Sequence, residues 1–176
     1  HKIARGAFGE VVLAWDDDLQ VNVAIKILHG EFVSNFPEVQ QRFLDEGRLL
    51  RRIRSTHVVN IHDVGRLEDG RPYFVMDFAD RGTLAARFSP VATAAKLDTR
   101  ILVILVDSLS EGLSAIHDAG IVHRDIKPAN ILLQALRRAG PDPNQTVMGD
   151  AGAEYGTLIG DDERVLLGDL GIAKDM

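Results

Sequence analysis

The chain has 176 residues, of which 45% are hydrophobic and 26% charged, a composition typical of a packed globular domain that is long enough to bury a core. Its 20 basic and 26 acidic residues give a formal net charge of −6, which argues against non-specific binding to nucleic acid. The chain has no cysteine, which excludes disulfide bonds and cysteine-ligated zinc and agrees with the cytoplasmic location that we expect.

The N-terminal part combines a glycine-rich turn with an apolar strand. Residues 6–11 read GAFGEV and residues 23–28 read VAIKIL. Glycine lets a backbone approach phosphate oxygens closely and adopt angles closed to other residues, although a plain glycine-rich hairpin turn would have the same sequence. Lys26 lies within the apolar strand, where burial of a charge is costly without a partner. The strand therefore predicts an anion beside Lys26.

The next segment, Asn35 to Arg54, predicts a helix. Its apolar residues fall close to helical spacing: Phe36, Val39, Phe43, Leu50 and Ile53. Glu46 lies on this face, whereas Asp45 points about 100° away around the helix. We therefore predict that Glu46 pairs with Lys26; the alternative is a solvated acid on a helix with many charges. Gly47 costs the helix about 1 kcal/mol relative to alanine, which would make it easier to melt or shift.

The middle of the chain predicts a strand, a linker and a second long helix. Pro72 to Ala79 is typical of a strand that runs into an extended linker, and the turn at Gly82 begins a short helix. Leu97 to Ala119 carries apolar residues at helical spacing: Ile101, Leu102, Leu105, Leu109, Leu113 and Ile116. The apolar run from 101 to 106 is too short to cross a membrane.

Residues 123–130, with the sequence HRDIKPAN, place a carboxylate, two cations and an amide within one short loop. A second short motif, GDLG, stands at residues 168–171. It follows the apolar residues 165–167 and is typical of a strand that ends in a turn. Taken alone, each motif also fits a surface turn in which Asp125, Asn130 or Asp169 only caps backbone groups.

An excursion separates two predicted strands of a hairpin, Leu132-Leu133 and Val165-Leu166. It runs from Gln134 to Arg164 and is rich in glycine and proline. We expect an irregular surface insertion with few core residues, since loops tolerate added length at small entropic cost; a regulatory or docking role is the alternative. Tyr155 to Ile159 could add a strand.

In this order, the motifs resemble those of the protein kinase family over nearly the whole chain. Residues 123–130 match the catalytic-loop pattern H-R-D-x-x-x-x-N at each fixed position, and the glycine-rich turn and lysine strand precede it. Lys127-Pro128 resembles serine/threonine kinases, and Ile172-Ala173 looks like the bacterial branch. Two residues depart from the family pattern: Ala4 replaces the first glycine, which an extended backbone would tolerate, and Leu170 replaces the phenylalanine of Asp-Phe-Gly.

The resemblance implies an α+β protein-kinase-like fold of two lobes. We expect an N-terminal nucleotide-binding lobe at 1–78, with an antiparallel sheet, one helix and the hinge. A partial, mainly helical C-terminal lobe would follow at 79–176, with the excursion at 134–164 and a truncation after the Asp-Leu-Gly motif. Because the chain begins at His1 and ends at Met176, we expect an excerpt of a longer protein that transfers phosphate poorly by itself.

The same resemblance assigns the site. Asp125 would be the base, Lys127 the phosphoryl stabiliser, and Lys26 with Glu46 the clamp on the α and β phosphates. Asn130 and Asp169 would be the magnesium ligands, and Arg124 would meet a regulatory phosphate. The nucleotide-binding residues would be Gly6, Gly9, Val11, Ala24, Lys26, Met76, Asp77, Ala79 and Leu132, with Leu170 as an apolar plug.

The resemblance thus predicts a serine/threonine protein kinase that uses ATP and Mg²⁺ and acts on protein hydroxyls. One alternative is a pseudokinase or nucleotide-binding regulatory module without transfer. A second is a small-molecule phosphotransferase of the same broad fold, against which Arg124 and Pro128 speak.

Overall fold

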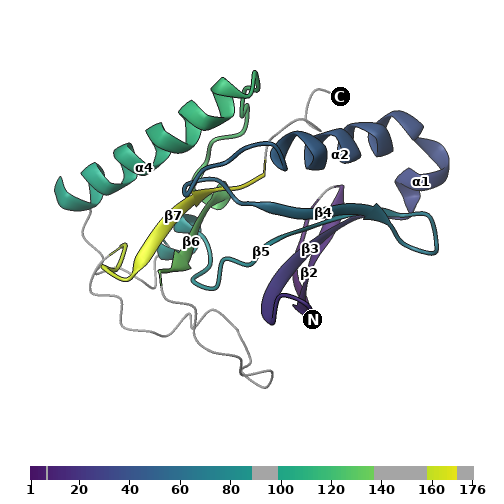
Figure 1. Cartoon of the computed structure of the whole chain (residues 1–176), viewed down its shortest axis with the longest axis horizontal. Coiled ribbons are helices and arrows are strands. Elements are labelled where there is room, and N and C mark those ends of the chain that lie inside the picture. Colours follow the sequence, from purple (N-terminus) through teal and green to yellow (C-terminus); the bar gives the residue numbers. More distant parts are fainter. Residues whose placement is uncertain (7, 89–98, 137–157, 170–176) are drawn as a thin grey trace. The chain divides into compact units, whose positions relative to one another are not determined.

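The computed structural model describes residues 1–6, 8–88, 99–136 and 158–169 (Figure 1). The chain forms two compact units. The first unit contains residues 1–54 and 59–78, and the second contains residues 55–58 and 79–169. The first lobe predicted from the sequence, 1–78, includes residues 55–58, which the structure groups with the second unit.

A five-stranded antiparallel sheet forms the first unit, in the order β1-β2-β3-β5-β4. The strands are β1 (Lys2–Arg5), β2 (Gly9–Asp16), β3 (Val21–Leu28), β4 (Ile61–Arg66) and β5 (Pro72–Asp77). The central strand β3 pairs with β2 from Asp16↔Val21 to Gly9↔Leu28, and with β5 on its other side. Both strands predicted from the sequence, at 23–28 and from Pro72, are confirmed.

Two helices accompany this sheet, α1 (Glu31–Asn35) and α2 (Pro37–Leu50), where the sequence predicted a single helix from 35 to 54. Phe36 separates them with φ −140° and ψ 73°, because a proline disfavours the helical conformation in the residue before it and favours the first position of a helix. Phe36 is 44% exposed and is not part of the buried face, while Ile53 is buried beyond the end of α2.

Gly47 has a packing role in α2. A Cβ atom at this position would lie 3.1 Å from both Phe74 Cδ1 and Val64 Cγ2, on β5 and β4. These distances are shorter than ordinary van der Waals contacts, so glycine lets the helix approach the sheet closely. The expectation that Gly47 only weakens the helix is therefore incomplete.

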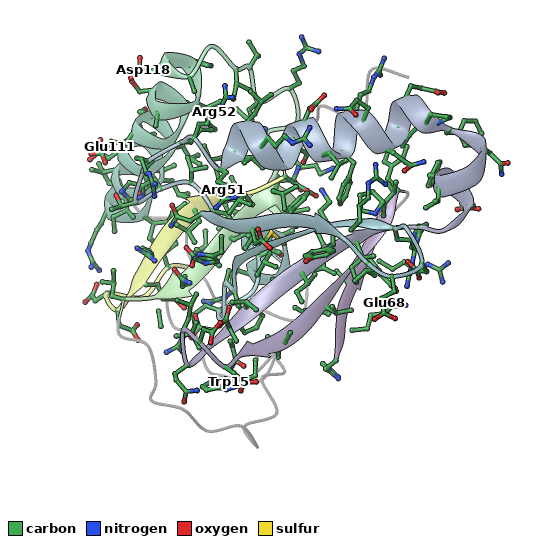
Figure 2. The ribbon with its side chains drawn as sticks, turned by 45° about the vertical axis from the view of Figure 1, so that its right-hand side comes forward. Trp15, Arg51, Arg52, Glu68, Glu111 and Asp118 are labelled. Atoms are coloured by element: carbon green, nitrogen blue, oxygen red, sulfur yellow. The ribbon has the colours of Figure 1, made fainter. Side chains whose placement is uncertain are left out.

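The second unit contains α3 (Leu84–Arg87), α4 (Thr99–Asp118) and the hairpin of β6 (Ile131–Ala135) and β7 (Glu163–Leu167). Thr83 caps α3, as its Oγ1 accepts a hydrogen bond of 3.2 Å from the backbone N–H of Ala86. Within the described residues, every helix falls short of the length and apolar character that crossing a membrane requires. Charged side chains such as Arg51 and Arg52 after α2, and Asp118 on α4, extend from the ribbon (Figure 2).

The buried face of α4 differs from the predicted one. It consists of Ile101, Leu105, Ser108, Gly112 and Ile116. Leu102 is 45% exposed, and Leu109 and Leu113 are only half-buried. On the buried face of α4, the small residues Ser108 and Gly112 stand where leucines were predicted. At position 112 only glycine fits, because a Cβ there would lie 2.8 Å from the carbonyl oxygen of His57.

Residues 55–58 join the second unit through β7. Val58 forms a parallel bridge with Leu167, and the N–H of Leu167 donates to the His57 carbonyl at 2.8 Å. The Nδ1–H group of His57 donates to the Val165 carbonyl at 2.9 Å. These hydrogen bonds explain why this segment departs from the first unit.

The excursion is shorter than predicted, because the hairpin pairs from Ile131↔Leu167 as far as Ala135↔Glu163. Gln134 and Arg164, its predicted ends, are paired strand residues. Leu158 and Ile159 are each 1% exposed and lie outside the strands, which contradicts the expectation of few core residues in this segment. Tyr155 lies outside the described residues.

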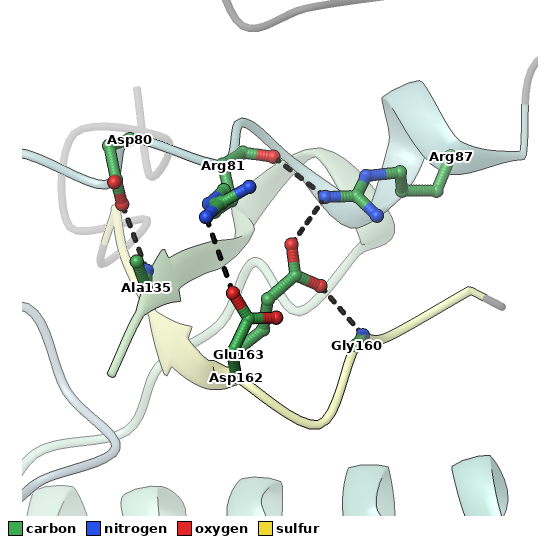
Figure 3. A network of polar contacts seen from close by, with 7 residues as sticks. All are labelled: Asp80, Arg81, Arg87, Ala135, Gly160, Asp162 and Glu163. Carbon is green, nitrogen blue, oxygen red and sulfur yellow. Dashed lines mark hydrogen bonds and ion pairs between the residues drawn. The ribbon is translucent and has the colours of Figure 1, made fainter. Parts of the chain in front are cut away.

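Polar contacts close the base of the excursion (Figure 3). The buried carboxylate of Glu163 accepts hydrogen bonds from Arg87 Nη2 and from the N–H of Gly160, each of 2.8 Å. Arg81 lies 3.3 Å from the Asp162 carboxylate, and Asp80 Oδ1 accepts a 2.9 Å bond from the backbone of β6. The C-terminal end of the excursion is therefore an integral part of the second unit.

Candidate functional site

The first unit brings Lys26 and Glu46 together, as the helical phase of α2 predicted. Lys26 Nζ lies 3.5 Å from Glu46 Oε1, and the Glu46 side chain is only 2% exposed. Lys26 Nζ also lies 5.4 Å from the ring centroid of Phe74 and 6.0 Å from that of Phe43, within the range of cation–π attraction. A buried carboxylate without a cation would be costly, so this pair fixes the direction of the lysine side chain.

The two described glycines of the N-terminal turn differ in their surroundings. A Cβ on Gly9 would lie 2.3 Å from the carbonyl oxygen of Ile27, so only glycine fits where β2 approaches β3. Gly6 has no such neighbour within 3.8 Å, and neither glycine has a positive φ. The expected conformational need for glycine is therefore wrong at both positions, and the need at Gly9 is steric. Ala4 lies in the extended strand β1, where its methyl group is tolerated.

The residues expected around an adenine ring lie on strands in both units. Ala24 is buried on β3, opposite Met76 of β5, while Val11 on β2 and Met76 are half-buried. Leu132 is half-buried on β6 of the second unit, where it bridges Thr83. Ala79, the first residue of the second unit after the hinge, is also half-buried.

Asp77, the last residue of β5, has two partners that the sequence interpretation missed. Its buried carboxylate accepts a 2.8 Å hydrogen bond from Asn60 Nδ2 and a 3.0 Å bond from His62 Nε2. Its N–H donates to the Asn60 carbonyl at 3.0 Å. The alternation of Asn60 and His62 around the apolar Ile61 was the available signal, since it places both side chains on one face of a strand.

In the second unit, buried His123 anchors the catalytic-loop motif. Its Nε2 atom lies 3.1 Å from the Gly168 carbonyl, and its Nδ1 atom lies 3.4 Å from the backbone nitrogen of Asp125. Since a carbonyl only accepts and an N–H only donates, the imidazole carries its proton on Nε2. Arg124 adopts a positive φ of 61°, a strained conformation for a residue with a side chain.

Asp125, Lys127 and Asn130 form a connected cluster. Asp125 Oδ2 lies 3.0 Å from Lys127 Nζ and accepts a 2.7 Å hydrogen bond from Asn130 Nδ2. The same amide nitrogen donates to the Asp125 carbonyl at 2.9 Å, and a short 3-10 helix, Pro128–Asn130, positions the amide. Because Asn130 donates both amide hydrogens to Asp125, its Oδ1 is the atom that suits a hard cation.

Gly168 connects this cluster to Asp169. Its N–H donates to the Asn130 carbonyl at 3.0 Å, and its own carbonyl is the partner of His123. Asp169 follows with a positive φ of 52°. Leu170, together with residues 171–173, lies outside the described residues, so the predicted apolar plug stays a prediction. The structure thus gathers Lys26 with Glu46 in one unit, and Asp125, Lys127, Asn130 and Asp169 in the other.

Sequence comparison identifies related proteins over the whole chain. The family model described as protein kinase domain matches residues 1–176. The serine/threonine-protein kinase Pkn1 of Myxococcus xanthus is 36% identical over 144 residues, which cover 81% of this chain and 19% of Pkn1. The serine/threonine-protein kinase PknJ of Mycobacterium tuberculosis is 32% identical over 172 residues, covering 98% of this chain and 24% of PknJ.

Solved structures show the same fold. The crystal structure of the PknI kinase domain of Mycobacterium tuberculosis aligns with a TM-score of 0.64 and 26% identity, covering 97% of this chain and 58% of that one. A double mutant of the same domain, C20A_R136N, aligns with a TM-score of 0.66. The chain therefore spans about a fifth to a quarter of the curated relatives and somewhat more than half of this solved kinase domain.

Proposed function

The chain belongs to the protein kinase family, and we propose that it serves in transferring the γ-phosphoryl group of ATP to serine or threonine hydroxyls of proteins. The observation that carries the proposal is the cluster around Asp125, whose Oδ2 lies 3.0 Å from Lys127 Nζ and 2.7 Å from Asn130 Nδ2. The names of the relatives, all serine/threonine kinases, and the Lys127-Pro128 pair support this acceptor class.

In the proposed reaction, Asp125 accepts the proton of the substrate hydroxyl as its oxygen forms a bond to the γ-phosphorus. The bond between that phosphorus and the bridging oxygen breaks, and ADP leaves with the electron pair. Lys127 offsets the charge on the transferred group, and the hydrogen bonds from Asn130 hold the Asp125 carboxylate in place. Lys26, directed by Glu46, would bind the α and β phosphates.

Magnesium would be held by Asn130 Oδ1 and the Asp169 carboxylate, both of which are the oxygen donors that this ion prefers. When bound, it supplies positive charge beside the β and γ phosphates. The described part of the chain holds no group of three or more histidine and acidic side chains suited to a metal. This agrees with an ion that takes its other ligands from the nucleotide.

Three further parts of the proposal concern regulation, location and adenine binding. Arg124 would bind a regulatory phosphate, which its strained backbone and its place beside the base support. A cytoplasmic location is supported by the absence of cysteine. The adenine-binding role of Val11, Ala24, Met76 and the hinge rests on the family resemblance.

The test measures autophosphorylation and peptide phosphorylation in the full-length protein that contains residues 1–176. We expect Asp125→Asn to lower kcat about 10²- to 10⁴-fold, the contribution typical of a general base, and Lys26→Met and Asp169→Asn to abolish turnover with an unchanged circular dichroism spectrum. ATP binding without turnover in the wild type would instead establish a pseudokinase. Turnover on sugars or aminoglycosides alone would establish a small-molecule phosphotransferase.

A further inference from the structure

A row of three phenylalanines connects the glycine-rich turn to α1. The ring of Phe8, in the turn, lies 5.6 Å from the ring of Phe32 in α1, with an interplanar angle of 46°. Phe32 lies 5.7 Å from Phe36, at 52°. Tilted rings at centroid distances of 4.5 to 7 Å attract one another beyond the area that they bury. None of the recognised motifs contains Phe32 or Phe36.

His29 ties the backbone of the same turn at two points. The backbone N–H of His29 donates to the Phe8 carbonyl at 2.9 Å. The ring Nε2 atom lies 3.2 Å from the Gly6 carbonyl, to which it donates. Gly6 closes the turn with a 2.8 Å bond from its own N–H to the Gly9 carbonyl. The segment between β3 and α1 therefore holds both the backbone and the tip of the turn.

These contacts matter because the strand pairing of β1 with β2 stops short of the turn. The last pair of that ladder is Arg5↔Glu10, so Gly6 and Phe8 both lie beyond it. Glycine-containing backbone loses much conformational freedom when it is ordered. A turn that other contacts already order does not bear this cost when a ligand binds.

We propose that Phe32 and His29 are positioning residues, which order the glycine-rich turn for nucleotide phosphates through Phe8 and Gly6. The inference rests on the proposed function, because it assigns the turn to phosphate binding. It predicts an effect confined to ligands that carry phosphates. A cluster that only stabilised the first unit would lower its melting temperature and leave the discrimination between ATP and adenosine unchanged.

The experiment measures dissociation constants for Mg-ATP, Mg-ADP and adenosine by titration calorimetry on the full-length protein. We expect Phe32→Ala to weaken the binding of ATP and ADP roughly 2- to 10-fold, the range for loss of one aromatic pair, and to leave the affinity for adenosine unchanged. His29→Ala should act in the same direction. Phe32→Leu, which keeps an apolar side chain of similar bulk for folding, should weaken ATP without a loss of secondary structure. Leu19→Ala, at an exposed residue in the β2–β3 turn, is the control and should change nothing.

A double-mutant cycle decides whether Phe32 acts through Phe8. In the Phe8→Ala background, the further change Phe32→Ala should leave ATP affinity unaltered, because the ring contact is already gone. Equal losses for ATP and adenosine, additive losses in the cycle, or unchanged ATP affinity in Phe32→Ala would each overturn the inference, whereas the proposed function would stand as long as the wild type phosphorylates a peptide. A wild-type protein that binds no ATP would overturn both.

Discussion

Replacing Glu163 by alanine should destabilise the protein more than any other single change at the base of the excursion. The substitution removes the carboxylate that lies 2.8 Å from Arg87 Nη2 and leaves a buried guanidinium without that counter-charge. It also removes the acceptor of the Gly160 N–H. Breaking a buried ion pair from one side costs about 3–5 kcal/mol, and an unsatisfied N–H group costs about 1–3 kcal/mol. We therefore expect a loss of at least about 3 kcal/mol in the free energy of unfolding, measured by urea denaturation.

Asp162→Ala provides the matched control. The neighbouring Asp162 side chain is 69% exposed and lies 3.3 Å from Arg81, so its removal should cost less than about 1 kcal/mol. The double replacement Arg87→Leu with Glu163→Leu should recover much of the lost stability, because it removes both charges together. If Glu163→Ala and Asp162→Ala shift the urea midpoint equally, the buried pair does not have the structural role argued for it.

Three further outcomes follow from the geometry. Gly9→Ala should lower the free energy of unfolding by about 1–3 kcal/mol, because its Cβ would lie 2.3 Å from the Ile27 carbonyl oxygen, whereas Gly6→Ala should have little effect on stability. Similar thermal midpoints for the two variants would contradict the steric argument. Deleting residues 141–157 should leave the free energy of unfolding nearly unchanged, but deleting 141–160 should lower it by several kcal/mol, because the longer deletion removes buried Leu158 and Ile159. Equal melting curves for the two deletions would be evidence against the place of these residues in the core. The hydrogen bond from Lys2 holds the pKa of Glu10 below its ordinary value, so the stability that this carboxylate adds is present at neutral pH and is lost as pH falls through the lowered pKa. Lys2→Met should raise the pKa of Glu10 in an NMR titration, and an unchanged pKa would refute the assignment.

Local regularities made part of the site predictable. The phase of an α-helix fixes which of Asp45 and Glu46 faces Lys26, and the five-residue spacing of Asp125 and Asn130 puts the two side chains within one loop. Pro37 carried a readable signal for the break at Phe36, because its effect on the preceding residue is also local.

Other features depend on which distant segments meet. The steric need for glycine at positions 9, 47 and 112 comes from atoms of Ile27, Phe74 and His57, which no local pattern identifies. Glu163 and Arg87, which form an ion pair, are 76 residues apart in the sequence. Leu158 and Ile159 are buried although they come directly after a glycine-rich stretch whose sequence resembles a surface loop. Composition described the excursion as a whole and missed the part that belongs to the core.

The attachment of residues 55–58 to β7 has a consequence for the order of folding. The hydrogen bond between His57 and Val165 joins residues 108 positions apart, and the bridge of Val58 with Leu167 spans a similar distance. A ribosome releases the whole sheet of the first unit once β5 has emerged, yet residues 55–58 then have no strand to pair with, because β7 has not been made. Contacts of such long sequence separation form late because a long loop must close first. We expect pulse-labelled hydrogen exchange to find the β3 and β5 amides protected before the amide of Leu167, whose acceptor is the carbonyl of His57.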